Sequence, residues 1–182
     1  MHSDMHIDAN NSAMLQLYIK LCRDYLDENT YYAQIAGFDY NLYTHPQGFT
    51  LKIYGFADKQ AEFTASVLKY ITTAQFNHDR FDRIKKTFLE KLDNELQESP
   101  YQQTMRYNAI ALTKGLFSPQ DIKATLETIS LEQLNSFIKE IYSRCSLLTF
   151  IHGNYTTHQA QNLSQHIYGL CSNKHPYTPV DF

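Results

Sequence analysis

Histidines and acidic residues near the N-terminus form the most compact set of metal-ligand types in this sequence of 182 residues. They are His2, Asp4, His6 and Asp8, which alternate with other residues. Imidazole and carboxylate groups bind zinc, but a stable site needs ligands that the fold holds together. A polar terminus is more often disordered than preformed, so we expect adventitious metal binding at most.

Two further histidines suggest chemistry by their position. Cys171 and His175 are four residues apart, but Pro176 indicates that the helix has already ended, and we interpret the pair as coincidental. His152 stands at the end of a predicted buried strand, where its ring can bond to a neighbouring carbonyl group. A structural role therefore suits His152 better than a catalytic one.

The cysteines do not form a disulfide framework. Cys22, Cys145 and Cys171 are few and widely spaced, and their odd number leaves at least one thiol unpaired. We predict that they are reduced and partly buried. A nucleophilic pairing of Cys22 or Cys145 with a histidine stays open as an alternative, although neither cysteine lies in a supporting motif.

The recognised catalytic motifs are absent from the sequence. It contains neither His-x-x-Glu-His nor His-Glu-x-x-His, the two helical zinc-binding signatures, and no Gly-x-Ser-x-Gly elbow or phosphate-binding glycine loop. We therefore predict no catalytic, cofactor-binding or metal-binding residues in this chain.

Composition restricts the class of protein. A chain of 182 residues with 43% hydrophobic content can form one compact core. The net charge of -3 and scattered basic residues argue against nucleic-acid binding. No apolar run is long enough to span a bilayer, and the polar first residues do not resemble a secretion signal.

The elements that must position these side chains begin with a helix and a hairpin. A helical pattern over Leu15–Asp27 and beyond stops at Gly37, and residues 38–43 and 49–54 then alternate between apolar and polar side chains. The turn His45-Pro46-Gln47-Gly48 separates the two predicted strands. Asp58 is the predicted N-cap of the next helix.

The rest of the chain predicts further helices and one strand. Helix starts are expected at Asn77, Ser99-Pro100, Ser118-Pro119, Ser130, and Thr156 or Thr157. The apolar run LLTFIHGN, residues 147–154, predicts a buried strand that joins the hairpin sheet. These elements indicate an α+β fold, a two-layer α/β domain in which helices lie largely on one face of an antiparallel sheet.

Four motifs occur in an order that resembles a known family. They are Tyr31-Tyr32-Ala33-Gln34-Ile35-Ala36-Gly37, Gly55-Phe56-Ala57-Asp58-Lys59-Gln60, Ser99-Pro100-Tyr101-Gln102-Gln103 and Gly153-Asn154-Tyr155-Thr156. From about Met14 to about Leu170, the chain resembles the third, non-catalytic domain of the insulysin and pitrilysin zinc metallopeptidases, the inverted zincins of peptidase family M16.

The resemblance implies a domain organisation. Residues 1–13 would be a polar N-terminal remnant, 14–171 a single non-catalytic domain with a metalloprocessing-peptidase-like fold, and 172–182 a C-terminal tail. In the family a strand precedes the first helix, and His6-Ile7-Asp8 would be what is left of it. We therefore expect a fragment of a larger polypeptide, whose uncovered sheet edge favours a homodimer.

The resemblance also implies a function. The chain alone would be no enzyme, whereas its parent would be a zinc metalloendopeptidase that degrades peptides, with the zinc in its catalytic domain and this domain forming part of the substrate chamber. Its partners would be the other domains and the peptide substrate, with no nucleic acid or membrane, in the periplasm or the cytoplasm. The first alternative is an inert homologue that serves as a subunit-interaction module, and the second is an independent enzyme with a cysteine or histidine site.

Overall fold

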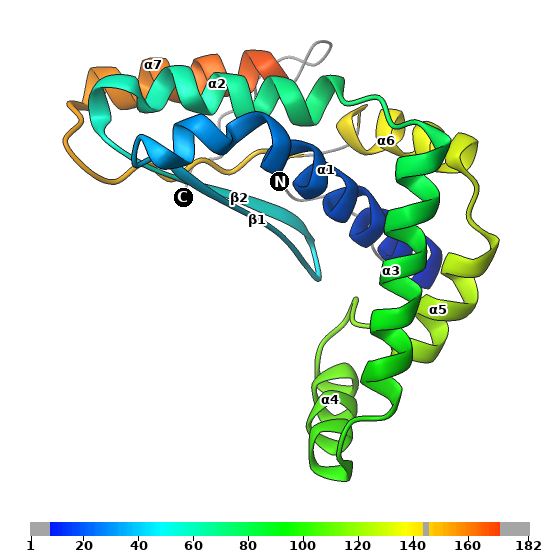
Figure 1. Cartoon of the computed structure of the whole chain (residues 1–182). Helices are drawn as coiled ribbons and strands as arrows, with labels where there is room; N and C mark the ends of the chain where they lie inside the picture. The colour runs from blue at the N-terminus through cyan, green and yellow to red at the C-terminus, as the bar shows by residue number, and fades with distance from the viewer. Residues whose placement is uncertain (1–7, 144–145, 172–182) are drawn as a thin grey trace.

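The computed structural model describes residues 8–143 and 146–171. The predicted remnant before Asp8, Cys145 and the tail 172–182 therefore lie outside the described residues. In chain order the elements are α1 (Ala9–Ile35), β1 (Asp39–His45), β2 (Gly48–Tyr54), α2 (Ala57–Thr73), α3 (His78–Leu96), α4 (Pro100–Leu112), α5 (Pro119–Thr128), α6 (Leu131–Ser143) and α7 (Thr157–Cys171) (Figure 1).

Helix α1 is the central element. It begins earlier than the predicted helix start at Leu15, because the side chain of Asp8 accepts a hydrogen bond from the Asn11 amide at 2.7 Å and caps the helix at Ala9. It ends at Ile35, and Gly37 follows with φ +89, a left-handed conformation that favours glycine. α1 contacts α2, α3, α5, α6 and β1, so it supplies the surface on which the chain folds.

The structure confirms the predicted hairpin. β1 and β2 are antiparallel, with Leu42 opposite Leu51 across the pair, and Leu42 and Phe49 are buried. Gly55 closes β2 with φ +152, and a Cβ atom there would overlap the ring of Phe38. Figure 1 shows α1, α2 and α7 on one side of the hairpin, and the contacts of α1 with β1 and of α2 with α7 agree with this layering.

Most of the predicted helix starts are confirmed by side-chain caps. Asn77 accepts from the Arg80 amide at 2.8 Å, and Ser118 accepts from the Asp121 amide at 3.1 Å. The other capping pairs are Ser99 with Gln102, Ser130 with Gln133, and Thr156 with Gln159.

The predicted cap at Asp58 is wrong. α2 begins at Ala57, and Phe56 occupies the N-cap position without a side-chain hydrogen bond. Asp58 lies instead within the first turn, where its carboxylate is close to the positive end of the helix dipole. Phe56 has an extended backbone and the helix begins directly after it, one residue before Asp58.

The predicted strand over residues 147–154 is also wrong. Among the described residues the sheet has two strands, β1 and β2, and none of these residues forms a backbone–backbone hydrogen bond with residues 147–152. Leu148 and Phe150 are 59% and 87% exposed, whereas the alternating residues Leu147, Thr149 and Ile151 are half-buried. An apolar run indicates burial only if a neighbouring strand covers it, and the described part of the chain supplies none.

The described part of the chain is thus α+β: it is mostly helical and has one small antiparallel sheet. Its core is one cluster between α1 and the helices around it. The largest fully buried side chains are Tyr18, Leu15, Leu17, Leu21, Leu26, Leu42, Leu126, Leu134 and Ile141. Helix α4 contributes no buried residue, and Figure 1 shows it at the far end of α3, away from the layer of α1, α2 and α7.

Candidate functional site

Cys22, the predicted alternative nucleophile, lies on the buried face of α1 and is 1% exposed. Burial raises the pKa of its thiol to about 12, and its hydrogen-bonding neighbour is the Tyr18 hydroxyl rather than a base. The nucleophile of a cysteine enzyme is the thiolate, which needs a lowered pKa. Cys22 therefore has the environment of an inert structural cysteine. Cys171 is buried at the end of α7.

Tyr18 is the buried polar group at the centre of the core. Its hydroxyl donates to the Ile71 carbonyl oxygen at 3.0 Å and lies 2.8 Å from the Tyr142 hydroxyl. Burial, with Cys22 and Tyr142 nearby, raises the pKa of Tyr18 well above its usual value, so the phenol stays neutral. These bonds join α1, α2 and α6 and satisfy a hydroxyl that would otherwise be costly to bury.

The histidine and acid positions singled out in the sequence do not assemble a metal site in the described residues. His152 is exposed, and its ring stacks on Phe150 with centroids 6.4 Å apart. His2, Asp4, His6 and His175 lie outside the described residues, and Asp8 caps α1. No group of three or more histidine, cysteine, aspartate or glutamate side chains that could hold a metal occurs in the described part.

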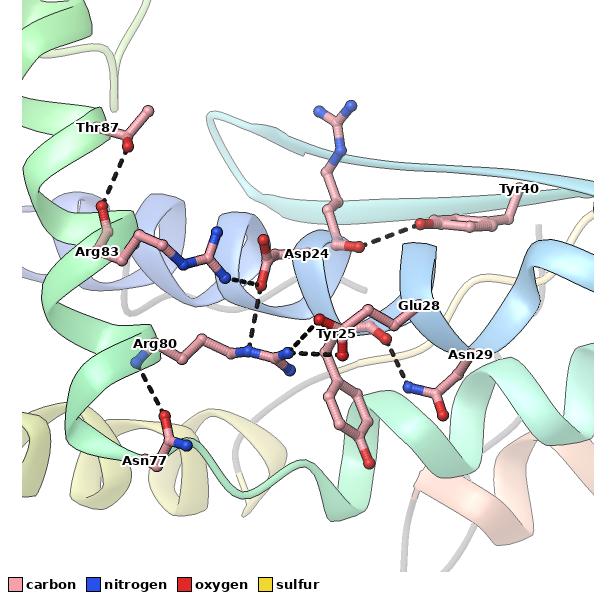
Figure 2. A network of polar contacts seen from close by, with 10 residues as sticks. Asp24, Tyr25, Glu28, Asn29, Tyr40, Asn77, Arg80, Arg83 and Thr87 are labelled. Carbon is pink, nitrogen blue, oxygen red and sulfur yellow. Dashed lines mark hydrogen bonds and ion pairs between the residues drawn. The ribbon is translucent and has the colours of Figure 1, made fainter.

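A charged network between α1 and α3 is the most organised polar feature of the surface (Figure 2). Asp24 and Glu28 are one turn apart on α1, and Arg80 and Arg83 are one turn apart on α3. Arg80 Nη2 lies 2.6 Å from Glu28 Oε1 and its Nε lies 3.2 Å from Asp24 Oδ2, which Arg83 Nη2 also approaches at 2.8 Å.

The network, called the α1–α3 clamp below, holds the two helices together and is not a reactive site. Two guanidinium groups face two carboxylates, so its charge is balanced, and the Arg80 guanidinium also lies 5.4 Å from the centroid of the Tyr25 ring. Guanidinium groups stay protonated in proteins and cannot act as bases. The sequence carries a signal for this clamp, with acids four residues apart on α1 and arginines three residues apart on α3, but the spacing alone does not show that the two helices pair.

Tyr40 extends the polar contacts from β1 to α1. Its hydroxyl donates to Asp27 Oδ1 at 2.6 Å and to the Arg23 carbonyl oxygen at 3.4 Å. Partial burial, together with the bond to the Asp27 carboxylate, raises the pKa of Tyr40 well above its usual value. The contact fixes the hairpin against α1.

An open hollow of about 820 Å³ lies between the start of α2 and α7. Its lining is Ala57, Asp58, Ala61, Asn154, Tyr155, Thr156, Gln159, Asn162, Leu163 and His166. Tyr155 donates to Gln60 Oε1 at 2.8 Å and so connects the turn before α7 to α2. The lining offers hydrogen-bonding amides and hydroxyls, which suit a polypeptide backbone or another protein surface, and it has no serine or cysteine nucleophile.

The comparisons with known proteins show the family to which the chain belongs. A family model described as the middle or third domain of peptidase M16 matches residues 2–125, which is more than half of the chain. The chain belongs to the M16 peptidase family. The resemblance of the sequence to the insulysin and pitrilysin enzymes is therefore confirmed, and the chain corresponds to their middle domain.

Individual relatives place the M16 domain within much longer proteins. It is 29% identical over 160 residues to insulin-degrading enzyme from Homo sapiens. The aligned region covers 88% of this chain and 16% of that protein. It is 28% identical over 168 residues to the A-factor-processing enzyme of Saccharomyces cerevisiae, with 92% and 16% covered. The crystal structure of pitrilysin matches with a TM-score of 0.78 at 16% identity, over 94% of this chain and 18% of that chain.

The M16 domain thus spans about a sixth of the length of the curated relatives that it matches. The similarity to pitrilysin shows a shared fold. No helix among the described residues is long and apolar enough to cross a membrane.

Proposed function

We propose that this chain is a catalytically inert domain of an M16-type zinc metalloendopeptidase and forms part of the wall of its substrate chamber. The observation that carries the proposal is the match to the middle domain of the family in a chain with no cluster of zinc ligands in its described part. Zinc needs three protein ligands and an open position for hydrolysis, and the described residues do not bring three such ligands together.

The other groups that could support hydrolysis also favour an inert domain. The buried thiol of Cys22 has a pKa of about 12, and the arginines and acids of the α1–α3 clamp are paired with one another. The zinc and the general base of the peptidase would therefore come from another domain of the same polypeptide. The partners of this domain would be those other domains and the peptide that they enclose.

The exposed surface suits contact with an extended peptide. Tyr32 and Tyr54, near the end of α1 and the end of β2, are 85% and 49% exposed. Among the described residues no other backbone pairs with residues 147–152, and Phe150 in this segment is exposed. Tyrosine offers a rigid apolar body with a polar tip, and unpaired extended backbone recognises another extended chain.

A zinc titration tests the absence of a metal centre in this chain. We expect calorimetry to show only weak binding, which disappears in a variant with His2→Ala and His6→Ala. Stoichiometric, tight zinc binding that survives in this variant would contradict the proposal, because it would require a ligand set among the other residues of the chain.

The parent reading frame separates this proposal from an interaction module. A peptidase parent should encode a His-x-x-Glu-His helix in another domain, because zinc and its water must be held there. A parent that lacks this motif throughout would favour a module that only binds other subunits.

A further inference from the structure

The α4 arm, residues 97–116, lies outside the hydrophobic core. It consists of α4 and the turns on either side of it, and none of its residues is buried (Figure 1). The last buried residue before the arm is Leu92 of α3, and the first after it is Pro119 of α5. Tyr101 and Leu112 on α4 are 73% and 88% exposed. Burial of apolar surface is the main source of folding stability, so the arm receives little of it.

Most of the contacts that hold the arm closed are polar and local. Gln103 Nε2 donates to the carbonyl oxygens of Leu96 and Glu98 at 3.2 and 2.8 Å. Arg106 donates to the Glu95 carbonyl oxygen at 3.0 Å and to Glu98 Oε2 at 2.6 Å. These acceptors belong to the last turn of α3 or to the arm itself. Each bond contributes modestly to stability, because water replaces the protein partner when the arm opens.

Two contacts tie the arm to more distant parts of the domain. Tyr107 donates to Gln120 Oε1 of α5 at 3.0 Å. Gly115, just after α4, lies so close to the hairpin turn that a Cβ atom there would be 2.8 Å from the Pro46 carbonyl oxygen. Each contact joins one residue of the arm to one residue of the body. Breaking them removes no side chain from the core.

Helix α4 also has little stability of its own. It is 13 residues long, and isolated helices of about 12–15 residues are marginal in water. A capping box of Ser99 and Gln102 stabilises its first turn. The helix therefore depends on its cap and on the few polar ties to stay folded.

We propose that the α4 arm is a local unfolding unit, which opens and recloses while the core of the domain stays folded. A region with few buried apolar contacts opens at a lower cost in free energy than the core does. The middle of α1 is the opposite case, because Leu17, Tyr18 and Leu21 are fully buried and their backbone becomes accessible when the whole domain unfolds. The arm thus lets α4 change its conformation without disturbing the core. This inference does not rest on the proposed role in a peptidase.

Hydrogen exchange of the full chain under native conditions tests the proposal. In the wild type, after correction for intrinsic rates, the α4 amides should exchange at least about tenfold faster than those in the middle of α1. Two matched variants then show which opening each helix uses. Ala109 on α4 and Ala61 on α2 are both exposed alanines within helices, and glycine at either position destabilises its helix through the backbone.

Ala61→Gly is the decisive variant, because it destabilises the core and leaves the arm untouched. It should speed exchange in the middle of α1 by about two- to fivefold, the range expected for such a change within a helix. The α4 amides should exchange as in the wild type, because α2 is folded whether the arm is open or closed. Ala109→Gly should speed exchange of the α4 amides by about two- to fivefold, because they exchange through the opening of α4 itself.

Wild-type α4 amides that are protected as strongly as the middle of α1 would overturn the proposal, and this comparison needs no variant. An equal increase in the exchange of α4 and α1 in Ala61→Gly would also overturn it, since α4 would then open only together with the whole domain. Far-UV circular dichroism checks that both variants are folded. None of these outcomes bears on the lack of catalysis, which is a separate claim.

Discussion

Helices α2 and α4 have the same pattern of apolar residues at three- and four-residue spacing and very different surroundings. The stripe of α2 includes Phe63, Val67 and Ile71, which are buried against the core, whereas the stripe of α4 is exposed along its length. Periodicity therefore predicts which face of a helix is apolar, and it leaves open what covers that face. In this chain the covered stripes build the fold, and the stripe of α4 stays exposed in the described structure.

The strongest test of this comparison makes the same substitution in both kinds of environment. Leu126, on α5, is fully buried, whereas Leu112, on α4, is 88% exposed. Leu126→Ala should lower the free energy of unfolding by about 2–5 kcal/mol, because it removes packed methyl groups and leaves a cavity. Leu112→Ala should change it by less than about 0.5 kcal/mol.

Urea denaturation measures both changes. Equal losses of unfolding free energy in the two variants would mean that α4 packs into the core in solution. The difference between covered and uncovered apolar stripes would then not exist.

A second test compares a glycine in a crowded position with a glycine in open space. Gly37 has φ +89, and a Cβ atom there would lie 3.1 Å from the Phe56 ring, whereas Gly169 has open space around it within α7. Gly37→Val should lower the free energy of unfolding by about 1–3 kcal/mol, because it forces a β-branched residue into a poorly allowed conformation. Gly169→Ala should raise it by roughly 0.5–1 kcal/mol, since alanine is the better helix former.

The denaturation midpoints of the two variants should therefore move in opposite directions. An unchanged midpoint for Gly37→Val would mean that Gly37 does not have the left-handed conformation assigned to the junction between α1 and β1.

A third test uses the buried thiol of Cys22. Its pKa is raised from 9.0 to about 12 in the folded chain, so above about pH 9 the unfolded chain loses a proton that the folded chain retains. The stability from this group is fully present below pH 9 and declines by about 1.4 kcal/mol per pH unit as the pH rises toward the folded pKa. Cys22→Ala should show a shallower decline between pH 9 and 11.

The difference in slope between wild type and Cys22→Ala is the informative quantity, because alanine also changes packing at every pH. Parallel slopes would show that the thiol is ionised or solvent-exposed in the folded chain, and the cysteine alternative would regain support.

The sequence predicted the features of this fold that depend on neighbouring residues. The caps at Asn77, Ser118 and Ser130 need only a side chain and an amide three residues away, and the hairpin needs only its alternation and its turn. The position of Gly37 followed from the same local reasoning.

What the sequence could not predict depends on contacts between distant residues. The strand expected at 147–154 required a neighbouring strand, which no local pattern can supply. The pairing of Arg80 with Asp24 and the bond from Tyr18 to the Ile71 carbonyl oxygen join residues more than fifty positions apart. The sequence did identify the family and the lack of a catalytic motif, because both rest on residue types in a fixed order.

Peptide hydrolysis by the isolated chain is the most direct test of the claim that this M16 domain is inert. The full chain is incubated with zinc and a fluorogenic peptide, with and without a chelator, and each fraction from a sizing column is assayed. We predict no turnover above the buffer in any fraction that contains the chain. Chelator-sensitive turnover that follows the purified chain through the column would contradict the account.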